Sequence, residues 1–468
     1  MSKQTEFTFD QPTTDADLLR SLLKRADKVL IKKLSNNDRN WARKKLDAEG
    51  NPVPGGKTMN NQAGPYIPAE TRKSDFFLPL QLLERTDGKS DEIWHREIST
   101  VWPQNEGERR TSNLRWYTSK NTETHLTGLP KSVFKDLLPA SFFIMGRLTG
   151  NDGYIYECLT IDSGSEEVQL LATLFDIRAD FVAGMFEPAT VQAEERERVL
   201  DFADQVIAAW LAGTIEDFEA NSASMPKTLE LAQMAQAAFL KTHGLEKIDP
   251  FALDSPGDVL REISRSIEWE LFKEFQRRER SVQLVRAVLG DKPRKFTPSD
   301  MMRALLDEFP RIDTILLSAA QQRKSRAGYS YEHHIEAMLT GGSIPFQKQV
   351  IIEAKKRPDF ILPSLKFMNS GTDKASTGLI LSAKTTLRER WKQVEREMGG
   401  HRRLFLTTVD ENIAGNAIED MASFGVHLVI PESLKESKLS EYKGYSNVLG
   451  FGEFCEINVR PNLASWNK

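Results

Sequence analysis

The stretch from Arg357 to Glu397 constrains the fold of this chain more than any other part of the sequence. Two short apolar runs lie in it, Phe360–Leu362 and Leu379–Leu381, and prolines or a glycine bound them. Runs of this length and composition are typical of short, buried strands. Asp359 opens the first run and Lys384 follows the second. Two neighbouring strands would therefore bring a carboxylate and an ammonium group to one edge of a sheet.

Asp359, Lys384 and Glu397 together suit metal-assisted hydrolysis of a phosphodiester. Mg²⁺ prefers oxygen ligands and takes one or two carboxylates from a protein, and it lowers the pKa of a bound water. A lysine beside it can orient the attacking water and offset the charge of the phosphate. Many ordinary strand pairs also have charged ends. Asp359 and Lys384 alone therefore leave both a metal site and a plain sheet open.

Further residues in this stretch resemble the EcoRII-type restriction endonucleases, a branch of the PD-(D/E)xK nucleases. Pro358-Asp359 and Lys384 match the PD and lysine elements, whereas Ser382 stands where most of the wider superfamily has its second acid. In this branch the acid lies on the following helix, at the place of Glu397. The signature of the branch is matched by Lys384-Thr385-Thr386 and, after a gap of three residues, by Arg390-Trp391-Lys392-Gln393.

The resemblance implies four catalytic residues: Asp359, Lys384, Glu397 and Glu332. Asp359 and Glu397 would be the ligands of the cofactor, Mg²⁺. Glu336 lies one helical turn after Glu332 and on the same face of a helix, so it is the second choice for that acid.

The polar, basic run Gln322–Glu332 predicts a turn that leads into a helix over Tyr331–Leu339. It also matches the EcoRII-type nucleases, which implies phosphate contacts for Arg323, Lys324 and Arg326. As a bare charge cluster these residues would be solvated. His333 and His334 are adjacent and point apart on a helix, so we interpret them as structural or surface residues and not as metal ligands.

Arg388, Glu389 and Arg390 follow Lys384 on the predicted helix. Arginine can bond O6 and N7 of guanine together, and glutamate can accept from N4 of cytosine. The triplet therefore suits consecutive C·G pairs, and the resemblance implies a palindromic or near-palindromic target containing 5′-CC…GG that two subunits read. The alternative is a solvated helix face with an Arg-Glu salt bridge.

The region from Phe76 to Ile177 predicts short strands separated by turn residues, which is typical of a small β-barrel. The predicted strands are Glu92–Ile98, Asn113–Tyr117, Glu123–Leu126, Ser141–Leu148, Gly153–Leu159 and Val168–Leu174. Two motifs, Leu34–Asp38 and Gly64–Pro68, resemble the N-terminal effector domain of the EcoRII-type enzymes. That domain is a DNA-binding pseudobarrel related to the B-three domain of plant transcription factors.

In such pseudobarrels two arms grip the major groove of DNA. The resemblance implies a first arm over Asn61–Tyr66, with Asn61 and Tyr66 in contact positions. A second arm over Ser119–His125 gives three candidates: Glu123, Thr124 and His125. This second arm departs from the family, whose arm is rich in Arg and Lys. The alternative is a polar hairpin tip without a role in binding.

The 468 residues carry a net charge of −4, so the whole chain gives no sign of a nucleic-acid partner. The charge is unevenly distributed, however. Basic segments Arg20–Lys57 and Gln321–Arg403 flank the acidic segment Glu187–Ala220. This arrangement predicts two polyanion-binding surfaces, although solvated faces of unrelated helices would give the same pattern.

We predict three regions. Residues 1–185 form an N-terminal, mostly-β DNA-binding pseudobarrel (effector) domain, and residues 186–257 a helical linker region. Residues 258–468 form an α/β restriction-endonuclease-like domain with a mixed sheet flanked by helices.

No apolar run approaches membrane-spanning length, and the polar, acidic start of the chain does not suit a signal peptide. Two cysteines, Cys158 and Cys455, give no framework for disulfides or zinc. We therefore expect a protein of the reducing cytoplasm that has no membrane partner.

These observations predict a type II restriction endonuclease that cuts double-stranded DNA as a homodimer. The resemblance also implies a cognate DNA methyltransferase in the same system. One alternative is a DNA-binding regulator with an inactive nuclease domain, against which the filled catalytic positions argue. The other is a structure-specific DNA repair nuclease, which would need the metal site but no base-reading helix.

Overall fold

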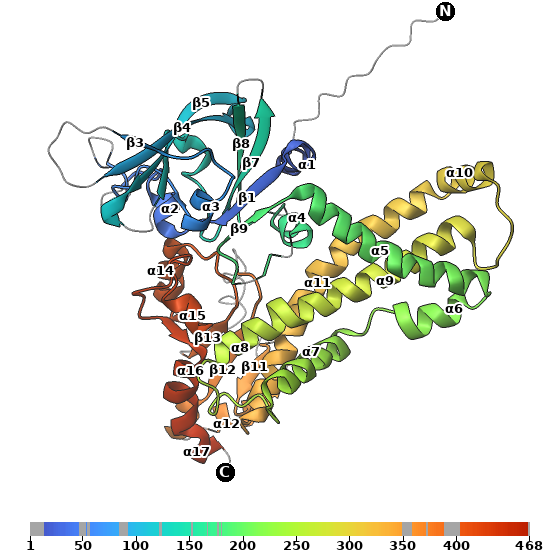
Figure 1. The fold of residues 1–468 in the computed structure, drawn as a ribbon. Helices are drawn as coiled ribbons and strands as arrows, with labels where there is room; N and C mark the ends of the chain where they lie inside the picture. The colour runs from blue at the N-terminus through green and yellow to red at the C-terminus, as the bar shows by residue number, and fades with distance from the viewer. Residues whose placement is uncertain are drawn as a thin grey trace, which may run out of the picture. The chain divides into compact units, whose positions relative to one another are not determined.

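The computed structural model describes residues 14–45, 53, 57–83, 92–120, 124–150, 153–165, 167–175, 177–178, 180–348, 358–370, 373–387 and 403–466. Its contacts divide the chain into two compact units, Met1–Ala193 and Glu194–Lys468. Figure 1 shows both units and labels many of their helices and strands.

The N-terminal unit is built on a nine-stranded sheet with the order β2-β6-β5-β4-β8-β7-β1-β9, and β3 pairs with β4. Its strands are β1 Lys28–Lys33, β2 Tyr66–Ile67, β3 Gln81–Leu83, β4 Ile93–Trp102, β5 Glu108–Tyr117, β6 Thr124–Thr127, β7 Phe142–Gly150, β8 Gly153–Ile161 and β9 Ala183–Phe186. Its helices are α1 Asp15–Arg25, α2 Asn36–Asn40, α3 Ala69–Lys73 and α4 Glu167–Leu174, with short 3₁₀ turns η1 Pro103–Asn105, η2 Thr118–Lys120 and η3 Lys131–Val133. The expected mostly-β N-terminal region is confirmed.

This sheet buries side chains on both faces where β1 and β7 pair. Leu30 of β1 packs in one apolar core, whereas its neighbours Val29 and Ile31 pack in another together with α1. The predicted strand Val168–Leu174 is wrong, because these residues lie in helix α4. Leu171 is buried in the core beside α1, and an apolar run of this length does not by itself distinguish a strand from a buried helix.

The C-terminal unit contains a six-stranded mixed sheet with the order β10-β11-β12-β13-β14-β15. Its strands are β10 Gln347–Lys348, β11 Phe360–Leu362, β12 Leu379–Ala383, β13 Leu404–Thr407, β14 Val426–Ile430 and β15 Val448–Gly450. The strands from β10 to β12 pair antiparallel, and those from β12 to β15 pair parallel. The expected mixed sheet is confirmed, and β15 extends it by a strand that we did not predict.

Helices cover both faces of this sheet, which explains why its strands are apolar throughout. Leu379 and Leu381 of β12 belong to one core with helices from the N-terminal half of the unit, whereas Ile380 lies in a second core with α14. The α-helices from α5 on are α5 Pro188–Leu211, α6 Ile215–Phe218, α7 Thr228–His243, α8 Pro256–Glu262, α9 Glu268–Leu289, α10 Pro298–Asp307, α11 Phe309–Gly341, α12 Leu365–Met368, α14 Gly415–Ser423, α15 Glu432–Lys435, α16 Phe451–Phe454 and α17 Leu463–Trp466. The π-helical turns are η4 Glu219–Ala223, η5 Ile263–Ile267 and η8 Cys455–Val459, and the 3₁₀ turns are η7 Asp373–Thr377 and η9 Arg460–Asn462.

Two helices differ from the sequence-based expectation. The predicted turn Gln322–Glu332 is wrong, because helix α11 runs without a break from Phe309 to Gly341 beside α9 (Figure 1). Helix α7 packs against α9 and α11, and its Ala235 and Phe239 are buried in the same core as the sheet. Residues 194–257 therefore belong to the C-terminal unit by contacts. None of the described helices is long and apolar enough to cross a membrane.

Candidate active site

The strand register brings three polar side chains to one edge of the C-terminal sheet. Phe360 of β11 pairs with Leu381 of β12 in antiparallel register. Continuing that register by one residue sets Asp359 opposite Ser382. Since side chains alternate along a strand, Ser382 and Lys384 share the face on which Asp359 lies. The two short apolar runs of the sequence thus fix the position of the polar residues at their ends.

Asp359 receives three hydrogen bonds on one oxygen. Oδ2 accepts from the hydroxyl of Ser382, from the amide N–H of Ala383 and from Nζ of Lys384, each at 2.8 Å. The side chain of Asp359 is 13% exposed and that of Lys384 is 28% exposed. The carboxylate is therefore held in one orientation in a mostly buried position, and the lysine balances its charge.

The other oxygen of Asp359, Oδ1, has no hydrogen bond from the described residues. A carboxylate with one oxygen held by donors and one open is suited to bind a hard cation such as Mg²⁺ through the open oxygen. The described part of the chain has no group of three His, Cys, Asp or Glu that could hold a metal ion. Glu397, the second predicted ligand, lies outside the described residues, as do Arg388, Glu389 and Arg390.

Helix α11 is tied to the same sheet edge through Thr407, the last residue of β13. The carbonyl of Thr407 accepts from the backbone N–H of Lys384 at 3.0 Å. Its Oγ1 lies 3.0 Å from the hydroxyl of Tyr331 on α11, and burial raises the pKa of that tyrosine. Glu332, the next residue, is 8% exposed. Arg323, Lys324 and Arg326 lie in α11, but their side chains are outside the described ones.

His334 is part of a buried network that joins three helices. Its Nε2 lies 2.6 Å from Oε2 of Glu268 on α9, and the hydroxyl of Ser330 donates to the other oxygen of that glutamate. The side-chain amide of Gln236 on α7 donates to the carbonyl of His333 and lies 3.1 Å from Nδ1 of His334. A structural role accounts for His334.

Glu336, the second choice for the acid on α11, is engaged elsewhere. Its Oε2 accepts from Nζ of Lys348 on β10 at 2.5 Å and lies 3.4 Å from Nδ1 of His333. Burial works to raise the pKa of Glu336, but the hydrogen bond and the charge of Lys348 outweigh it and lower that pKa. Glu336 is therefore engaged with Lys348 of β10 and His333.

The segment after Lys384 is fixed by residues that the sequence analysis missed. Arg265 of η5 donates to the carbonyl of Thr385 at 2.9 Å. Asp410, in the loop after β13, accepts from the backbone N–H of Leu387 at 2.8 Å. Asp410 follows the carboxyl end of β13 by three residues. Functional loops gather at that edge of a parallel sheet, so this position is a signal that could have drawn attention to Asp410.

In the N-terminal unit, the two predicted DNA-contacting arms meet. β2 pairs antiparallel with β6, and Tyr66 stands opposite His125. A Cβ atom at Gly64 would lie 1.8 Å from the carbonyl oxygen of Leu126, so only glycine fits there. Asn61 is exposed, whereas Tyr66 and His125 are half-buried. Thr124 is fully buried, which does not suit a direct contact with a base, and Glu123 lies outside the described residues.

A buried ion pair anchors the first arm. Asp38 accepts from Nζ of Lys32 at 2.7 Å and from the backbone N–H of Tyr66 at 2.7 Å. Lys32 in turn donates to the carbonyl of Tyr66. Lys32 and Asp38 are 3% and 2% exposed, and burial lowers the pKa of the lysine. Asp38 of the Leu34–Asp38 motif therefore holds the end of the first arm from a buried position.

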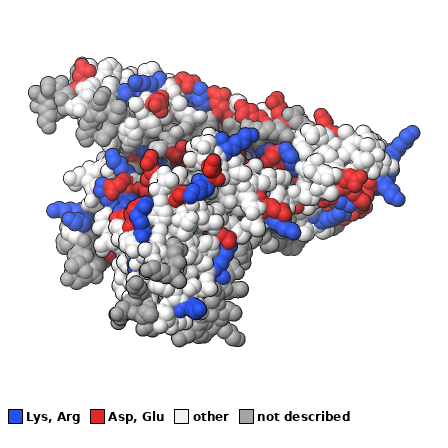
Figure 2. Space-filling view, turned by 90° about the horizontal axis from the view of Figure 1, so that it is seen from below, with Lys and Arg blue, Asp and Glu red and all other residues white. Residues whose placement is uncertain are grey.

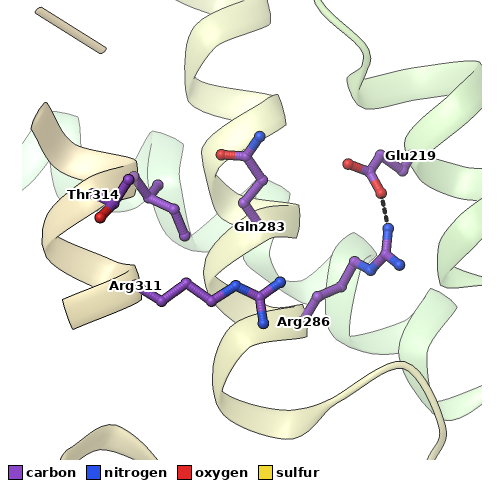
Figure 3. A pocket seen from close by; sticks show the side chains of 6 residues that line it. Glu219, Gln283, Arg286, Arg311 and Thr314 are labelled. Atoms are coloured by element: carbon purple, nitrogen blue, oxygen red, sulfur yellow. Dashed lines mark hydrogen bonds and ion pairs between the residues drawn. The ribbon is translucent and has the colours of Figure 1, made fainter. Parts of the chain in front are cut away.

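A separate pocket of about 480 Å³ lies among α9, α11 and η4. Figure 3 shows that Arg286 and Arg311 extend into it from two helices. Arg286 donates to Glu219 and to Asp291, and the bond to Asp291 raises the pKa of this arginine. Because acidic neighbours already neutralise Arg286, this pocket is a poor candidate for binding phosphate.

Charged side chains of both signs lie on the face of the molecule that Figure 2 shows. In the face that Figure 2 shows, blue Lys and Arg and red Asp and Glu are interspersed among the coloured residues. Much of the predicted basic segment Gln321–Arg403 lies outside the described side chains. The prediction of two basic surfaces therefore stays a prediction.

Comparisons with known proteins agree with the resemblance of the motifs. Residues 294–455 match the family model described as EcoRII C terminal. The chain is 27% identical over 233 residues to the type II restriction enzyme SsoII of Shigella sonnei, a match covering 47% of this chain and 74% of that protein. It is 35% identical over 118 residues to the type II restriction enzyme EcoRII of Escherichia coli, a match covering 25% of this chain and 29% of that protein.

Among solved structures, metal-depleted Ecl18kI in complex with uncleaved, modified DNA is similar, with a TM-score of 0.44 and 23% identity. This likeness covers 58% of this chain and 86% of the Ecl18kI chain. The family model matches the region that contains the edge formed by Asp359 and Lys384. Together with the sequence relatives, this match supports the resemblance of this part of the chain to the EcoRII-type restriction endonucleases.

Proposed function

We propose that this chain is a type II restriction endonuclease that uses Mg²⁺ to cleave double-stranded DNA at a target containing 5′-CC…GG. The observation that carries the proposal is the site at Asp359. One oxygen of its carboxylate is held by Ser382, Ala383 and Lys384, and the other is open among the described residues.

Each residue of this edge has a role in the proposed reaction. Asp359 would hold Mg²⁺ through its open oxygen, with Glu397 as the second carboxylate and Glu332 as a further acid. The ion, when bound, lowers the pKa of a water and neutralises charge on the phosphate. Lys384 keeps its ammonium group beside that position, where it orients the attacking water and stabilises the growing negative charge. Arg323, Lys324 and Arg326 would contact neighbouring phosphates.

A plasmid digestion tests the proposal. The purified chain should convert plasmid DNA to discrete fragments with Mg²⁺ and leave it intact with EDTA, and sequencing of the ends should return one motif with adjacent C·G pairs. Binding without cleavage under all metal conditions would favour the regulator with an inactive nuclease domain. Cutting only at branched or damaged DNA would favour the structure-specific repair nuclease.

Two substitutions test the proposed reading of bases by Arg388, Glu389 and Arg390. Glu389→Ala or Arg390→Ala should lose roughly 1–3 kcal/mol of discrimination against a changed base pair, the worth of one bidentate contact. Thermal melting should stay near that of the wild type. Mapped ends without adjacent C·G pairs would contradict the assignment of Arg388, Glu389 and Arg390.

The N-terminal unit is proposed to be a B-three-like effector domain that binds a DNA site. Asn61, Tyr66 and His125 are the described candidates for contact, and Glu123 is a further predicted position. The pairing of Tyr66 with His125 supports a single surface built from both arms. Asn61→Ala should weaken the binding of the isolated target duplex in a gel-shift assay, whereas Asp136→Ala, at an exposed residue elsewhere in the unit, should not.

A homodimer is proposed on the apolar face of helix α10 and the start of α11. Five large apolar side chains are exposed there: Met301 44%, Met302 59%, Leu305 40%, Leu306 70% and Phe309 65%. The helix is well formed, since Thr297 and Asp300 build a capping box at its start. A contiguous exposed apolar face of this kind marks an interaction surface.

A second copy suits this face because its charges are self-complementary. If two α10 helices lie antiparallel about Leu305, Arg303 of one copy faces Asp307 of the other. Leu306→Glu should convert a dimer to a monomer in sedimentation analysis, whereas Leu211→Glu, at an exposed leucine of α5, should not. A monomeric wild type would contradict the dimer. A cognate DNA methyltransferase and a cytoplasmic location remain predictions.

A further inference from the structure

After Lys384 the chain is held at two points by the end of the neighbouring strand. The N–H of Lys384 donates to the carbonyl of Thr407 at 3.0 Å, and the N–H of Leu387 donates to Oδ2 of Asp410 at 2.8 Å. Strands β12 and β13 are parallel, so both chains leave the sheet at the same edge. The four residues from Lys384 to Leu387 therefore follow a path set by β13 and the loop after it.

Asp410 is itself held firmly. It is 3% exposed, and its other oxygen, Oδ1, accepts from the N–H of Asn412 at 3.0 Å. Its own N–H donates to the hydroxyl of Thr408, and the hydroxyl of Tyr442 donates to its carbonyl. Burial raises the pKa of Asp410. A buried carboxylate is a costly way to gain stability, which indicates that its benefit lies in fixing geometry.

Two further contacts fix the same segment. The side chain of Leu387 is completely buried in the core that also contains Ile380 and Leu406. Arg265 of η5 donates to the carbonyl of Thr385. Arg265 precedes the segment in the sequence, whereas Asp410 follows it. The segment is thus held by the backbone N–H groups of Lys384 and Leu387, by the Leu387 side chain and by the Thr385 carbonyl. A substitution at Asp410 removes one of these contacts and leaves the others.

We propose that Asp410 is a positioning residue for base reading. It fixes Leu387 relative to the catalytic Lys384, and Leu387 directly precedes the predicted reading triplet Arg388–Arg390 in the sequence. This inference rests on the proposed function of the triplet. A displacement of about 1 Å in such a position is enough to slow a reaction roughly 10²-fold. Asp410 would therefore couple the reading of the target to cleavage of the adjacent phosphate.

Glu432 provides a matched control in the same unit. It is also a carboxylate that accepts two backbone N–H bonds, from Asp258 at 3.0 Å and from Gly452 at 2.8 Å. Burial raises its pKa as well. Glu432 anchors helices α8 and α16 and not the segment after Lys384. Asp410→Ala is compared with Glu432→Ala, and Asp410→Asn with Glu432→Gln. These comparisons distinguish a displaced Lys384–Leu387 segment from a general loss of folding stability.

The first readout is the ratio of cleavage rates on the mapped target duplex and on a duplex with one C·G pair replaced. Asp410→Ala should lower this ratio by about 10-fold or more, the size of one lost bidentate base contact. Asp410→Asn keeps one oxygen acceptor, so it should lower the ratio less than Asp410→Ala does. The Glu432 variants should lower the melting temperature but leave the ratio unchanged. An unchanged ratio in Asp410→Ala, or an equal fall in Glu432→Ala, would overturn the proposal.

The second readout does not depend on cleavage. Hydrogen exchange of the peptide that covers residues 384–387 should be faster in Asp410→Asn than in the wild type and unaffected by Glu432→Gln. Unchanged exchange would show that Asp410 does not hold the segment. If the wild type cut no DNA, the proposed function would fail, and the exchange result would still decide whether Asp410 is the anchor.

Discussion

Lys384 and Asp359 form a close ion pair in which Nζ lies 2.8 Å from Oδ2, although Asp359 precedes β11 and Lys384 follows β12. The pair uses only one carboxylate oxygen, which Ser382 and Ala383 share as hydrogen-bond donors. The lysine therefore orients the carboxylate without occupying the oxygen that faces away from it. This geometry separates the two roles that the proposed site needs, metal binding by Asp359 and charge stabilisation by Lys384.

The first prediction concerns these two residues. Asp359→Ala removes the carboxylate that would hold Mg²⁺, and Lys384→Ala removes the cation beside the phosphate. Each variant should cut plasmid DNA at least about 10²-fold more slowly than the wild type, the usual loss for one electrostatic group of an active site. Gel-shift binding of the target in Ca²⁺ should persist. Cleavage by Asp359→Ala at the wild-type rate would show that the site has been assigned wrongly.

The second prediction concerns Ser382, which stands where the wider superfamily has an acid. Its hydroxyl orients Asp359 and touches no other described group of the site. Ser382→Ala should keep cleavage but require roughly 10- to 100-fold more Mg²⁺ for half-maximal rate, as expected when a group that supports a metal ligand is lost. The titration of rate with Mg²⁺ measures this. A variant with an unchanged Mg²⁺ requirement would show that Ala383 and Lys384 orient the carboxylate without help.

The apolar runs of the sequence predicted the two strands beside the candidate site. Phe360–Leu362 and Leu379–Leu381 were predicted to be short buried strands, and the pairing of β11 with β12 brings Asp359 to Lys384. Asp410 and Arg265 could not be found in the same way. They contact the segment after Lys384 from 23 residues downstream in one case and 120 residues upstream in the other. No local pattern encodes contacts between such distant parts of the chain.

The errors of the sequence analysis have a common physical cause. Val168–Leu174 was predicted as a strand from its apolar residues, but packing against α1 decides that it is a helix. The polar run Gln322–Glu332 was predicted as a turn, yet it continues helix α11. In both segments local composition is compatible with two structures, and tertiary contacts select one of them.

The third prediction concerns the pH dependence of the N-terminal unit. The guanidinium group of Arg147, almost completely buried, binds the carboxylate of Asp27 through Nε at 3.0 Å. Burial works to raise the pKa of Asp27, but the hydrogen bond and the charge of Arg147 outweigh it and lower that pKa. A lowered folded-state pKa means that this stabilisation is present above the unfolded pKa of about 3.9. It is lost as the pH falls through the folded pKa.

Asp27→Asn should therefore lower the free energy of unfolding at pH 7 by roughly 1–2 kcal/mol. This figure is smaller than that of a fully buried pair, because the Asp27 side chain is 44% exposed and solvent screens it. The difference from the wild type should shrink toward zero as the pH is lowered from 5 to 3. Denaturant unfolding across this range measures it, with Asp136→Asn at an exposed carboxylate as the control. A difference that does not depend on pH would contradict the role of the ion pair.

The fourth prediction concerns where the nuclease unit begins. The predicted boundary was residue 257, whereas the contacts separate the units between Ala193 and Glu194. Ala235, Phe239 and Ile248 are buried in the core that contains Phe360 and Leu381 of the catalytic sheet. Loss of one buried phenylalanine side chain alone costs about 3–5 kcal/mol, a large part of the roughly 5–15 kcal/mol that stabilises a typical domain.

A fragment of residues 194–468 should therefore fold and cut DNA, whereas a fragment of residues 258–468 should lack a cooperative thermal transition. Circular dichroism melting and plasmid cleavage of the two fragments measure this directly. In the full chain, Phe239→Ala should lower the melting temperature of the nuclease unit, and Leu229→Ala, at an exposed position of the same helix, should not. Cooperative melting of the shorter fragment at the temperature of the longer one would show that α7 is not part of the nuclease core.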